Sequence, residues 1–173
     1  KVDKEMLNDV RNKIKNSKRI AVPGCHASGF ISLVYPLVEA GALDGSENLS
    51  CFSLTGYSGG GKKMIAEYEE EPDELLGAPR QYGLTQTHKH LKEMQAITGL
   101  ERKPLFSPII ADYYSGMVVS VPLYADFLQK KMSLEELWSY FNEYYKGEAF
   151  IKVMPLGSEE ETANMLPGNE CSG

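Results

Sequence analysis

The order of secondary-structure patterns along the chain predicts an α+β domain, with a mixed, largely antiparallel sheet and helices packed on one of its faces. Strand-like and helical runs follow one another irregularly, unlike the regular alternation of a doubly wound parallel sheet. Residues 116–124 alternate Met117, Val119 and Val121 with a mixed second set, which is typical of an antiparallel strand. With 173 residues, 42% of them hydrophobic, the chain can bury a core of one domain, or at most of two small ones.

Five segments have apolar residues at the spacing of an α-helix. They are residues 4–15, 27–39, a helix that starts near residue 62, 88–98 and 133–147. Pro36 lies inside the second segment, where its missing N–H should remove one hydrogen bond and bend the helix. Ser133 and Glu136 form a capping box at the start of the last segment, and Gly99 and Gly147 mark the ends of the last two.

Five shorter runs have strand character: residues 19–22, 49–55, 105–111, 116–124 and 150–154. Pro23 and Gly24 end the first run, because proline fixes φ and lacks a donor. Pro108 and Pro122 favour edge positions or bulges in the later runs.

The charge pattern argues against a nucleic-acid or membrane surface. The chain has 18 basic and 24 acidic residues, a net charge of −6, and no basic run longer than two residues. No apolar stretch approaches the roughly 18 residues of a membrane span, and no signal-like segment begins the sequence. Cys25, Cys51 and Cys171 form no closely spaced pair, so we expect free thiols in a reducing compartment, the cytoplasm.

Cys25 is the strongest candidate for a nucleophile, because it lies between the predicted strand 19–22 and the predicted helix 27–39. The unpaired N–H groups and the positive dipole end of a helix favour a thiolate there. The same donors could bind an oxyanion that forms when the sulfur attacks a carbonyl. A free cysteine is more often a small buried residue, which is what we expect of Cys51; Cys171 lies in a polar tail.

A nucleophilic cysteine needs a proton-transfer partner, and the chain has three histidines. His26 follows Cys25 directly, and it is the weakest candidate because neighbouring side chains on a helix point apart. His88 and His90 lie at the start of the predicted helix 88–98; the alternative is a solvated pair without a role. An HxH pair with one distant cysteine lacks the spacing of zinc motifs, so we expect no metal.

Residues 56–63, Gly-Tyr-Ser-Gly-Gly-Gly-Lys-Lys, match the GxxxxGK part of a P-loop between a predicted strand and a predicted helix. Lys63 stands where a Ser or Thr hydroxyl would hold Mg²⁺, so nucleoside triphosphate hydrolysis is not expected. The loop could still contact a phosphate or a cofactor through its backbone donors and Lys62, or it could be a flexible connector.

Together these segments resemble N-acetyl-γ-glutamyl-phosphate reductase, in particular the shorter of its two subfamilies. The matching motifs occur in the family's order between residues 19 and 123. They are Ala-Val-Pro-Gly-Cys at 21–25, the glycine loop at 55–63, Thr-His-Lys-His-Leu-Lys-Glu-Met at 87–94, Phe-Ser-Pro at 106–108 and Gly-Met at 116–117.

The resemblance implies the catalytic and oligomerisation domain of a reductase related to the glyceraldehyde-3-phosphate and aspartate-semialdehyde dehydrogenases. Cys25 would attack the acyl phosphate of N-acetylglutamyl phosphate and release phosphate as a thioester forms. NADPH would then reduce the thioester to N-acetylglutamate semialdehyde, in arginine biosynthesis. The resemblance also implies roles for further residues: His88 as the general acid/base with His90 as its alternative, Tyr82, His90 and Thr55 near the substrate, and Ser58 and Gly59 near the cofactor.

The sequence departs from the family pattern in two ways. The family often has Tyr after the cysteine and Pro after the HxH-Leu motif, where this chain has His26 and Lys92, so we expect local differences in the pocket. The sequence also lacks a dinucleotide-binding fold with its glycine fingerprint. We therefore expect residues 1–173 to be one domain of a longer homo-oligomeric protein, with NADP bound mainly by another domain and with little reductase activity alone.

Two other functions stay open on the residues alone. Cys25 and His88 could form the dyad of a cysteine hydrolase, oriented by Asp112. The chain could instead be a non-catalytic phosphate-binding or oligomerisation module, with the aromatic helix around residues 137–145 as its interface.

Overall fold

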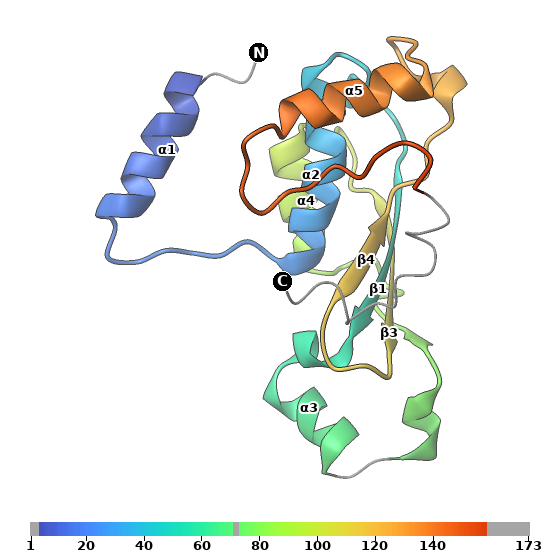
Figure 1. The fold of residues 1–173 in the computed structure, drawn as a ribbon. Coiled ribbons are helices and arrows are strands. Elements are labelled where there is room, and N and C mark those ends of the chain that lie inside the picture. The colour runs from blue at the N-terminus through green and yellow to red at the C-terminus, as the bar shows by residue number, and fades with distance from the viewer. Residues whose placement is uncertain (1–3, 71–72, 159–173) are drawn as a thin grey trace.

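The computed structural model describes residues 4–70 and 73–158 (Figure 1). Within these residues the sheet has four strands in the order β2-β3-β1-β4. The strands are β1 (Ser50–Gly56), β2 (Arg80–Gln81), β3 (Leu105–Ala111) and β4 (Met117–Ser120). β1 and β3 are parallel, whereas β4 pairs antiparallel with β1, and β2 antiparallel with β3. The predicted α+β class with a mixed sheet is confirmed, although the longest pairing is the parallel one.

One face of the sheet carries the hydrophobic core. Cys51, Ser53 and Thr55 alternate along β1 and are all buried. The parallel register sets Cys51 beside Phe106 and Thr55 beside Ile110, and these residues of β3 are buried too. The core face therefore passes from apolar side chains at one end of β1 to hydroxyl side chains at the other.

Two helices cover this face and pack against each other, α2 (Cys25–Glu39) and α4 (His90–Thr98) (Figure 1). Each apolar side chain that they bury in the core contributes about 1.5–3 kcal/mol. The side chains that are most completely buried include Phe30, Val34, Leu91 and Met94. α4 ends before Gly99, whose φ of 74° is left-handed as a glycine stop requires.

The last described helix, α5 (Leu134–Tyr144), directs aromatic side chains to α2, and it has the predicted capping box. α2 continues through Pro36, which leaves the carbonyl of Ser32 without its helical donor. Tyr145 donates a 2.6 Å hydrogen bond to that carbonyl, and Tyr144 donates to a carboxylate on α2. These aromatic groups are thus engaged within the chain, which argues against the alternative that this helix is an outward interface.

Two predicted strands are wrong. Residues 19–22 form no strand, because no described strand lies alongside to complete their backbone hydrogen bonds. The side chains of Ile20 and Val22 are exposed. Residues 150–154 also form no strand. The indole of Trp138 donates to the carbonyl of Met154 over 2.7 Å, so this segment is fixed against α5 rather than against the sheet.

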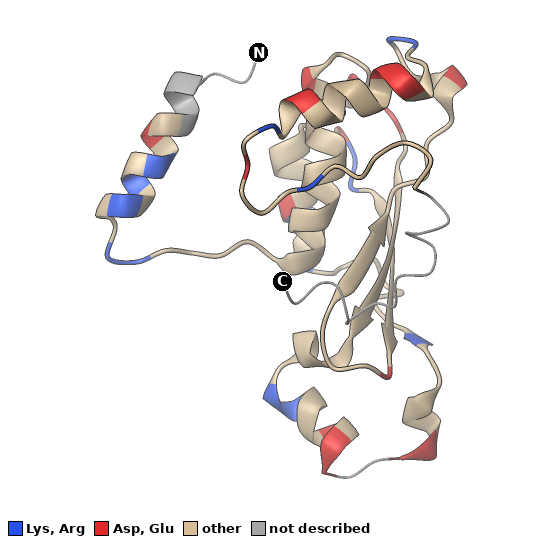
Figure 2. Ribbon diagram, in the orientation of Figure 1, with Lys and Arg blue, Asp and Glu red and all other residues tan. Residues whose placement is uncertain are grey.

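Two further helices are α1 (Lys4–Asn16) and α3 (Lys62–Glu69), and none of their described side chains belongs to the main core. Figure 1 shows α1 apart from the sheet, and α3 at the opposite end of the sheet from α5. Figure 2 shows basic residues gathered along the second half of α1 and the loop after it, and acidic residues on α5. Among residues 4–70 and 73–158, none of the helices combines the length and the apolar composition that a bilayer crossing needs.

Candidate active site

Cys25 is the first residue of α2, as the sequence predicts. Gly24 precedes it as an extended N-cap residue without a side-chain cap, and the first turn contains no acidic residue. The N–H of Ser28 makes the first helical hydrogen bond, to the carbonyl of Gly24, so the earlier N–H groups have no acceptor within the helix. The thiol is free and exposed at the positive end of the helix dipole, where an anion is favoured.

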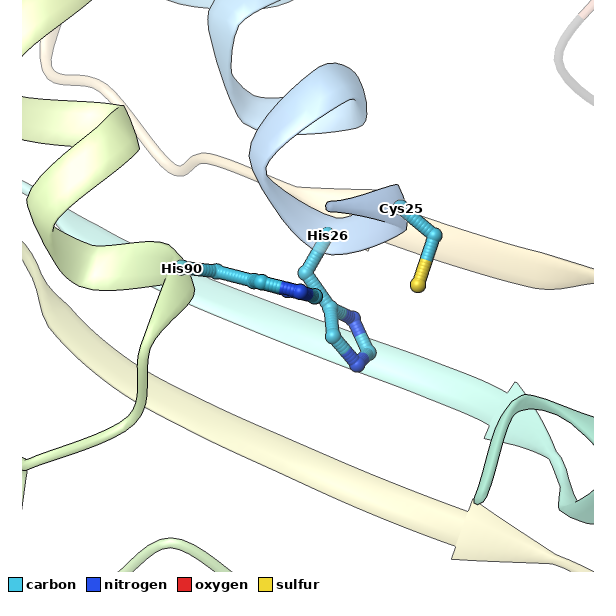
Figure 3. Close-up of side chains that lie close together, drawn as sticks. All are labelled: Cys25, His26 and His90. Atoms are coloured by element: carbon cyan, nitrogen blue, oxygen red, sulfur yellow. The ribbon is translucent and has the colours of Figure 1, made fainter. Parts of the chain in front are cut away.

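Three side chains meet at this helix end (Figure 3). The sulfur of Cys25, a ring nitrogen of His26 and a ring nitrogen of His90 all lie within 4.8 Å of one another. We call these three residues the Cys25 cluster. Gly24 permits the approach of α4, because a Cβ at this position would lie 2.1 Å from the His90 ring. The fold therefore brings the nucleophile candidate next to an imidazole that is sixty-five positions away in sequence.

His26 lies buried at the centre of the site. Its Nδ1 is 2.8 Å from the hydroxyl of Ser53, and its Nε2 is 2.8 Å from the hydroxyl of Tyr82. Burial, together with His90 and His88, lowers the pKa of His26 to about 4. The expectation that His26 points away from Cys25 is wrong, because its long side chain reaches the same space. Both ring nitrogens of His26 already have hydrogen-bond partners within the protein.

Acidification is expected to destabilise the fold through His26. Its folded pKa of about 4 lies below the ordinary value of 6.5, so the folded state excludes a proton that the unfolded chain binds. The stability that results is complete above pH 6.5 and is lost as the pH falls towards 4, by about 2–3 kcal/mol. Urea unfolding at pH 7 and pH 4.5 measures this loss. His26→Gln should reduce the difference between the two pH values, and an unchanged difference would contradict the assignment.

His88 and His90 occupy different positions beside the cluster. α4 begins at His90 rather than at the predicted residue 88, so His88 lies in the turn before the helix and is half-buried. The two rings are 4.6 Å apart between centroids, and His88 Nδ1 accepts from the N–H of His90. Burial lowers the pKa of both imidazoles, while Glu93 opposes the shift. The member of the pair that belongs to the Cys25 cluster is His90.

His90 also has an unsatisfied nitrogen. The side chain is 6% exposed, and its buried Nδ1 has no hydrogen-bond partner among the described residues. A buried imidazole nitrogen without a partner costs free energy unless a proton, a ligand or a reacting group uses it.

Tyr82 and Thr55 lie on the side of the cluster that the sheet forms. Burial and the neighbouring Cys25 raise the pKa of Tyr82 to about 12, so its hydroxyl keeps its proton beside His26. Thr55 is buried and donates its hydroxyl hydrogen to the carbonyl of Gly56 over 3.2 Å. Both hydroxyls therefore have partners within the protein, that of Tyr82 at His26 and that of Thr55 at Gly56.

The glycine loop does not form a phosphate cradle. Residues 57–60 are a single 3₁₀ turn after β1. Four backbone N–H groups of the loop, at residues 56, 57, 58 and 61, donate to backbone carbonyls. Gly59 is exposed and lies beside Thr55, since a Cβ at Gly59 would be 3.8 Å from the Thr55 hydroxyl. The backbone N–H of Ser58 already donates to a carbonyl. A cofactor contact in this loop would therefore use the Ser58 side chain or the backbone N–H groups of Gly59 and Gly60.

Asp112 makes no described hydrogen bond to the histidine that it would orient in a cysteine hydrolase. It is exposed in the loop between β3 and β4. Partial desolvation, Glu69 and the Asp112 charge together raise the pKa of Tyr57, which places Asp112 beside that tyrosine. The described hydrogen bonds of the imidazoles go to Ser53, to Tyr82 and between His88 and His90, not to Asp112.

Sequence reasoning missed three residues that shape the site. Ser53 holds His26, Glu93 accepts the N–H of Gly24 over 2.8 Å, and Gln86 holds the loop that carries His88. Two of them had a signal in the sequence. Ser53 alternates with Thr55 on one strand face, and Glu93 lies one helical turn after His90.

Gln86 is expected to be important for stability. Its φ of 56° is left-handed, and its side-chain amide pairs with both the N–H and the carbonyl of Phe106, at 2.8 and 2.7 Å. Gln86→Ala removes both hydrogen bonds and keeps the backbone strain, so the free energy of unfolding should fall by about 1–3 kcal/mol. Gln86→Gly removes the same hydrogen bonds, but glycine adopts the left-handed φ without strain. The free energy of unfolding should therefore fall less in this variant. Urea unfolding compares the three proteins, and equal stabilities would refute this role.

Known proteins are similar to this chain over nearly its whole length, which includes the candidate site. The chain is 39% identical over 173 residues to an N-acetyl-gamma-glutamyl-phosphate reductase of Sinorhizobium medicae, covering 98% of this chain and 55% of that protein. It is 38% identical to the enzyme of the same name from Rhizobium meliloti and 37% identical to that from Brucella ovis, covering 55% and 52% of those proteins. The resemblance predicted from the motifs is thus confirmed, and the chain spans about half the length of these relatives.

A family model gives the same result for the domain. The model described as "Semialdehyde dehydrogenase, dimerisation domain" matches residues 25–172, so the match begins at the candidate nucleophile and includes every described site residue after it. The chain therefore belongs to the semialdehyde dehydrogenase dimerisation-domain family.

Proposed function

We propose that this chain carries out the acyl-transfer half of an N-acetyl-γ-glutamyl-phosphate reductase reaction. The observation that carries the proposal is that an exposed helix-start thiol, Cys25, and a ring nitrogen of the buried His90 lie within 4.8 Å of each other. The names of the relatives supply the substrate class, an acyl phosphate. Their agreement with the thiol chemistry favours this function over the alternatives.

In the proposed step, the sulfur of Cys25 attacks the acyl carbon of N-acetylglutamyl phosphate. A carbon–sulfur bond forms, the bond from carbon to the phosphate oxygen breaks, and phosphate leaves with the electron pair. The thiol proton passes to the free nitrogen of His90 and from there to the departing phosphate. The N–H groups at the start of α2 face the carbonyl oxygen as its negative charge develops.

His88 is the partner that the resemblance implies, and it stays a prediction beside His90. Its ring contacts both His90 and His26, at centroid distances of 4.6 and 5.8 Å. We propose that His90 exchanges the proton with Cys25, and that His88 holds the backbone of His90 and closes the substrate side of the pocket with Tyr82.

NADPH is the proposed hydride donor for the second half of the reaction, reduction of the thioester. The described residues contain no dinucleotide-binding fold, and four N–H groups of the glycine loop are already engaged. The residues present therefore do not fit the main binding site of a dinucleotide. We assign this chain the acyl transfer alone and derive no step through the cofactor.

A place in arginine biosynthesis and in the cytoplasm completes the proposal. The pathway is what the resemblance to the reductase family implies, and the location is favoured by the thiols. Cys25 and Cys51 are both free, which suits a reducing compartment.

The test is whether the acyl group stays on the enzyme. Mixing the chain with N-acetylglutamyl phosphate, without nicotinamide, should release one equivalent of phosphate per chain in a burst and then stop, because the thioester waits for hydride. A cysteine hydrolase would continue to turn over, and a non-catalytic module would release nothing above the background rate. Either of these outcomes would overturn the proposal.

The sheet face opposite the helices is the proposed dimer interface. Phe52, Leu105 and Val118 point to this face and are 49, 64 and 45% exposed, and β1, β3 and β4 carry no charged residue. An apolar face of this kind is typical of an interaction site. The description of the matched family favours a second copy of the chain as its partner.

Phe52→Asp should disrupt this dimer. A carboxylate at the centre of an apolar interface would be desolvated without a partner, so the dissociation constant should rise about 30-fold or more. Analytical ultracentrifugation measures the change. Leu75→Asp is the matched control, because Leu75 is exposed in the short turn at residues 74–77, away from the sheet face. If both variants stay dimeric, the interface lies elsewhere.

A further inference from the structure

We propose that the Cys25 cluster also binds one zinc ion, or another thiophilic divalent cation, with Cys25, His26 and His90 as its protein ligands. The donor atoms of the three residues lie within 4.8 Å of one another (Figure 3). One thiolate, two imidazoles and an open fourth position are a ligand set that zinc accepts. This inference goes beyond the proposed function, because a bound ion would occupy the sulfur that acyl transfer needs.

The structure brings together a set of possible metal ligands that the sequence does not suggest. The HxH pair, His88 and His90, has a spacing that predicts no zinc site with a distant cysteine. The rings of His88 and His90 are 4.6 Å apart between centroids, but the ligand atoms that lie within 4.8 Å of one another belong to Cys25, His26 and His90.

Little movement would complete the site. In a tetrahedral zinc complex the ligand atoms lie about 3.4–3.6 Å apart, given metal–ligand bonds of about 2.0–2.3 Å. The three donors would therefore approach one another by about 1 Å. The exposed thiol of Cys25 can rotate to do so, and its exposure also gives the ion a path into the site.

The surroundings of the two histidines support metal binding. His90 is only 6% exposed, and its buried Nδ1 has no hydrogen-bond partner among the described residues. A metal ion could occupy such a nitrogen. His26 is held by oxygen atoms on both ring nitrogens, those of Ser53 and Tyr82. When the ion replaces one of these oxygens, the other remains as the hydrogen-bond acceptor that metal-bound histidines require.

Titration of the chain with Zn²⁺ in a calorimeter, and with Co²⁺ in a spectrophotometer, tests the proposal. We expect one ion per chain and a thiolate-to-cobalt charge-transfer band. Cys25→Ser should abolish the band, and His90→Asn should weaken binding by about tenfold or more. His88→Asn is the matched comparison, the same substitution two residues away. Because His88 supports the backbone of His90 but supplies no ligand atom to the cluster, this variant should weaken binding clearly less than His90→Asn does. Circular dichroism checks that each variant is folded.

Two results would overturn the proposal: absence of stoichiometric binding, or equal weakening by His88→Asn and His90→Asn. A further readout separates this inference from the proposed function. Bound zinc should slow alkylation of Cys25 by iodoacetamide, and a chelator should restore it. Because alkylation needs no acyl phosphate, failure here leaves the acyl-transfer proposal intact, and failure of the phosphate burst leaves the zinc site intact.

Discussion

Replacing Cys25 by serine should reduce phosphate release from N-acetylglutamyl phosphate by about 10³-fold or more. A serine hydroxyl is a far weaker nucleophile at neutral pH than a thiol, because it loses its proton much less readily even beside an imidazole. The side chain is exposed, so the substitution should leave the fold unchanged. A phosphate assay on rapidly mixed samples measures the burst.

Cys51→Ala is the matched control for this experiment. Cys51 is fully buried in the core, and burial raises the pKa of its thiol to about 12, so it cannot be the nucleophile. Its truncation should cost some stability and leave the burst at one equivalent per chain. A burst that survives in Cys25→Ser, or disappears in Cys51→Ala while the chain stays folded, would refute the role of Cys25.

His90→Asn should slow the same burst by about 10²-fold or more, whereas His88→Asn should slow it much less. General acid/base catalysis contributes about 10²–10⁴-fold, and His90 is the imidazole that lies in the Cys25 cluster. Asparagine keeps polar atoms near both positions but cannot exchange the proton. Stopped-flow measurement of phosphate release on the two variants gives the ratio directly.

The outcome of this comparison decides between the two histidines. If His88→Asn has the larger effect, the assignment implied by the family resemblance is correct, and His90 serves only to position the site. Circular dichroism and urea unfolding of both variants show whether either loss is a loss of folding. The N–H of His90 donates to His88 Nδ1, so a small effect at His88 is compatible with its positioning role.

Much of the fold could be predicted because it depends on local patterns. The alternation of Cys51, Ser53 and Thr55 and the helical spacing in α2 are properties of neighbouring residues. The strands at residues 19–22 and 150–154 were wrong because a strand also needs a partner. Apolar β-branched residues such as Ile20 and Val22 carry a strand pattern whether or not such a partner is present.

The candidate site shows the same division between local and non-local information. Cys25 at the start of α2 follows from Pro23 and Gly24, which fix where the helix begins. The choice between His88 and His90 depends on where α4 starts, and helix boundaries are weakly encoded. The position of His26 between Ser53 and Tyr82 joins three distant segments of the chain, so no spacing in the sequence could reveal it.

Peptide mass mapping after reaction with N-acetylglutamyl phosphate tests directly whether Cys25 is the residue that accepts the acyl group. The account predicts that, without nicotinamide, one N-acetylglutamyl group is attached per chain as a hydroxylamine-sensitive thioester, on the peptide that contains Cys25. Attachment at another residue, or an unmodified chain while phosphate is released continuously, would contradict it.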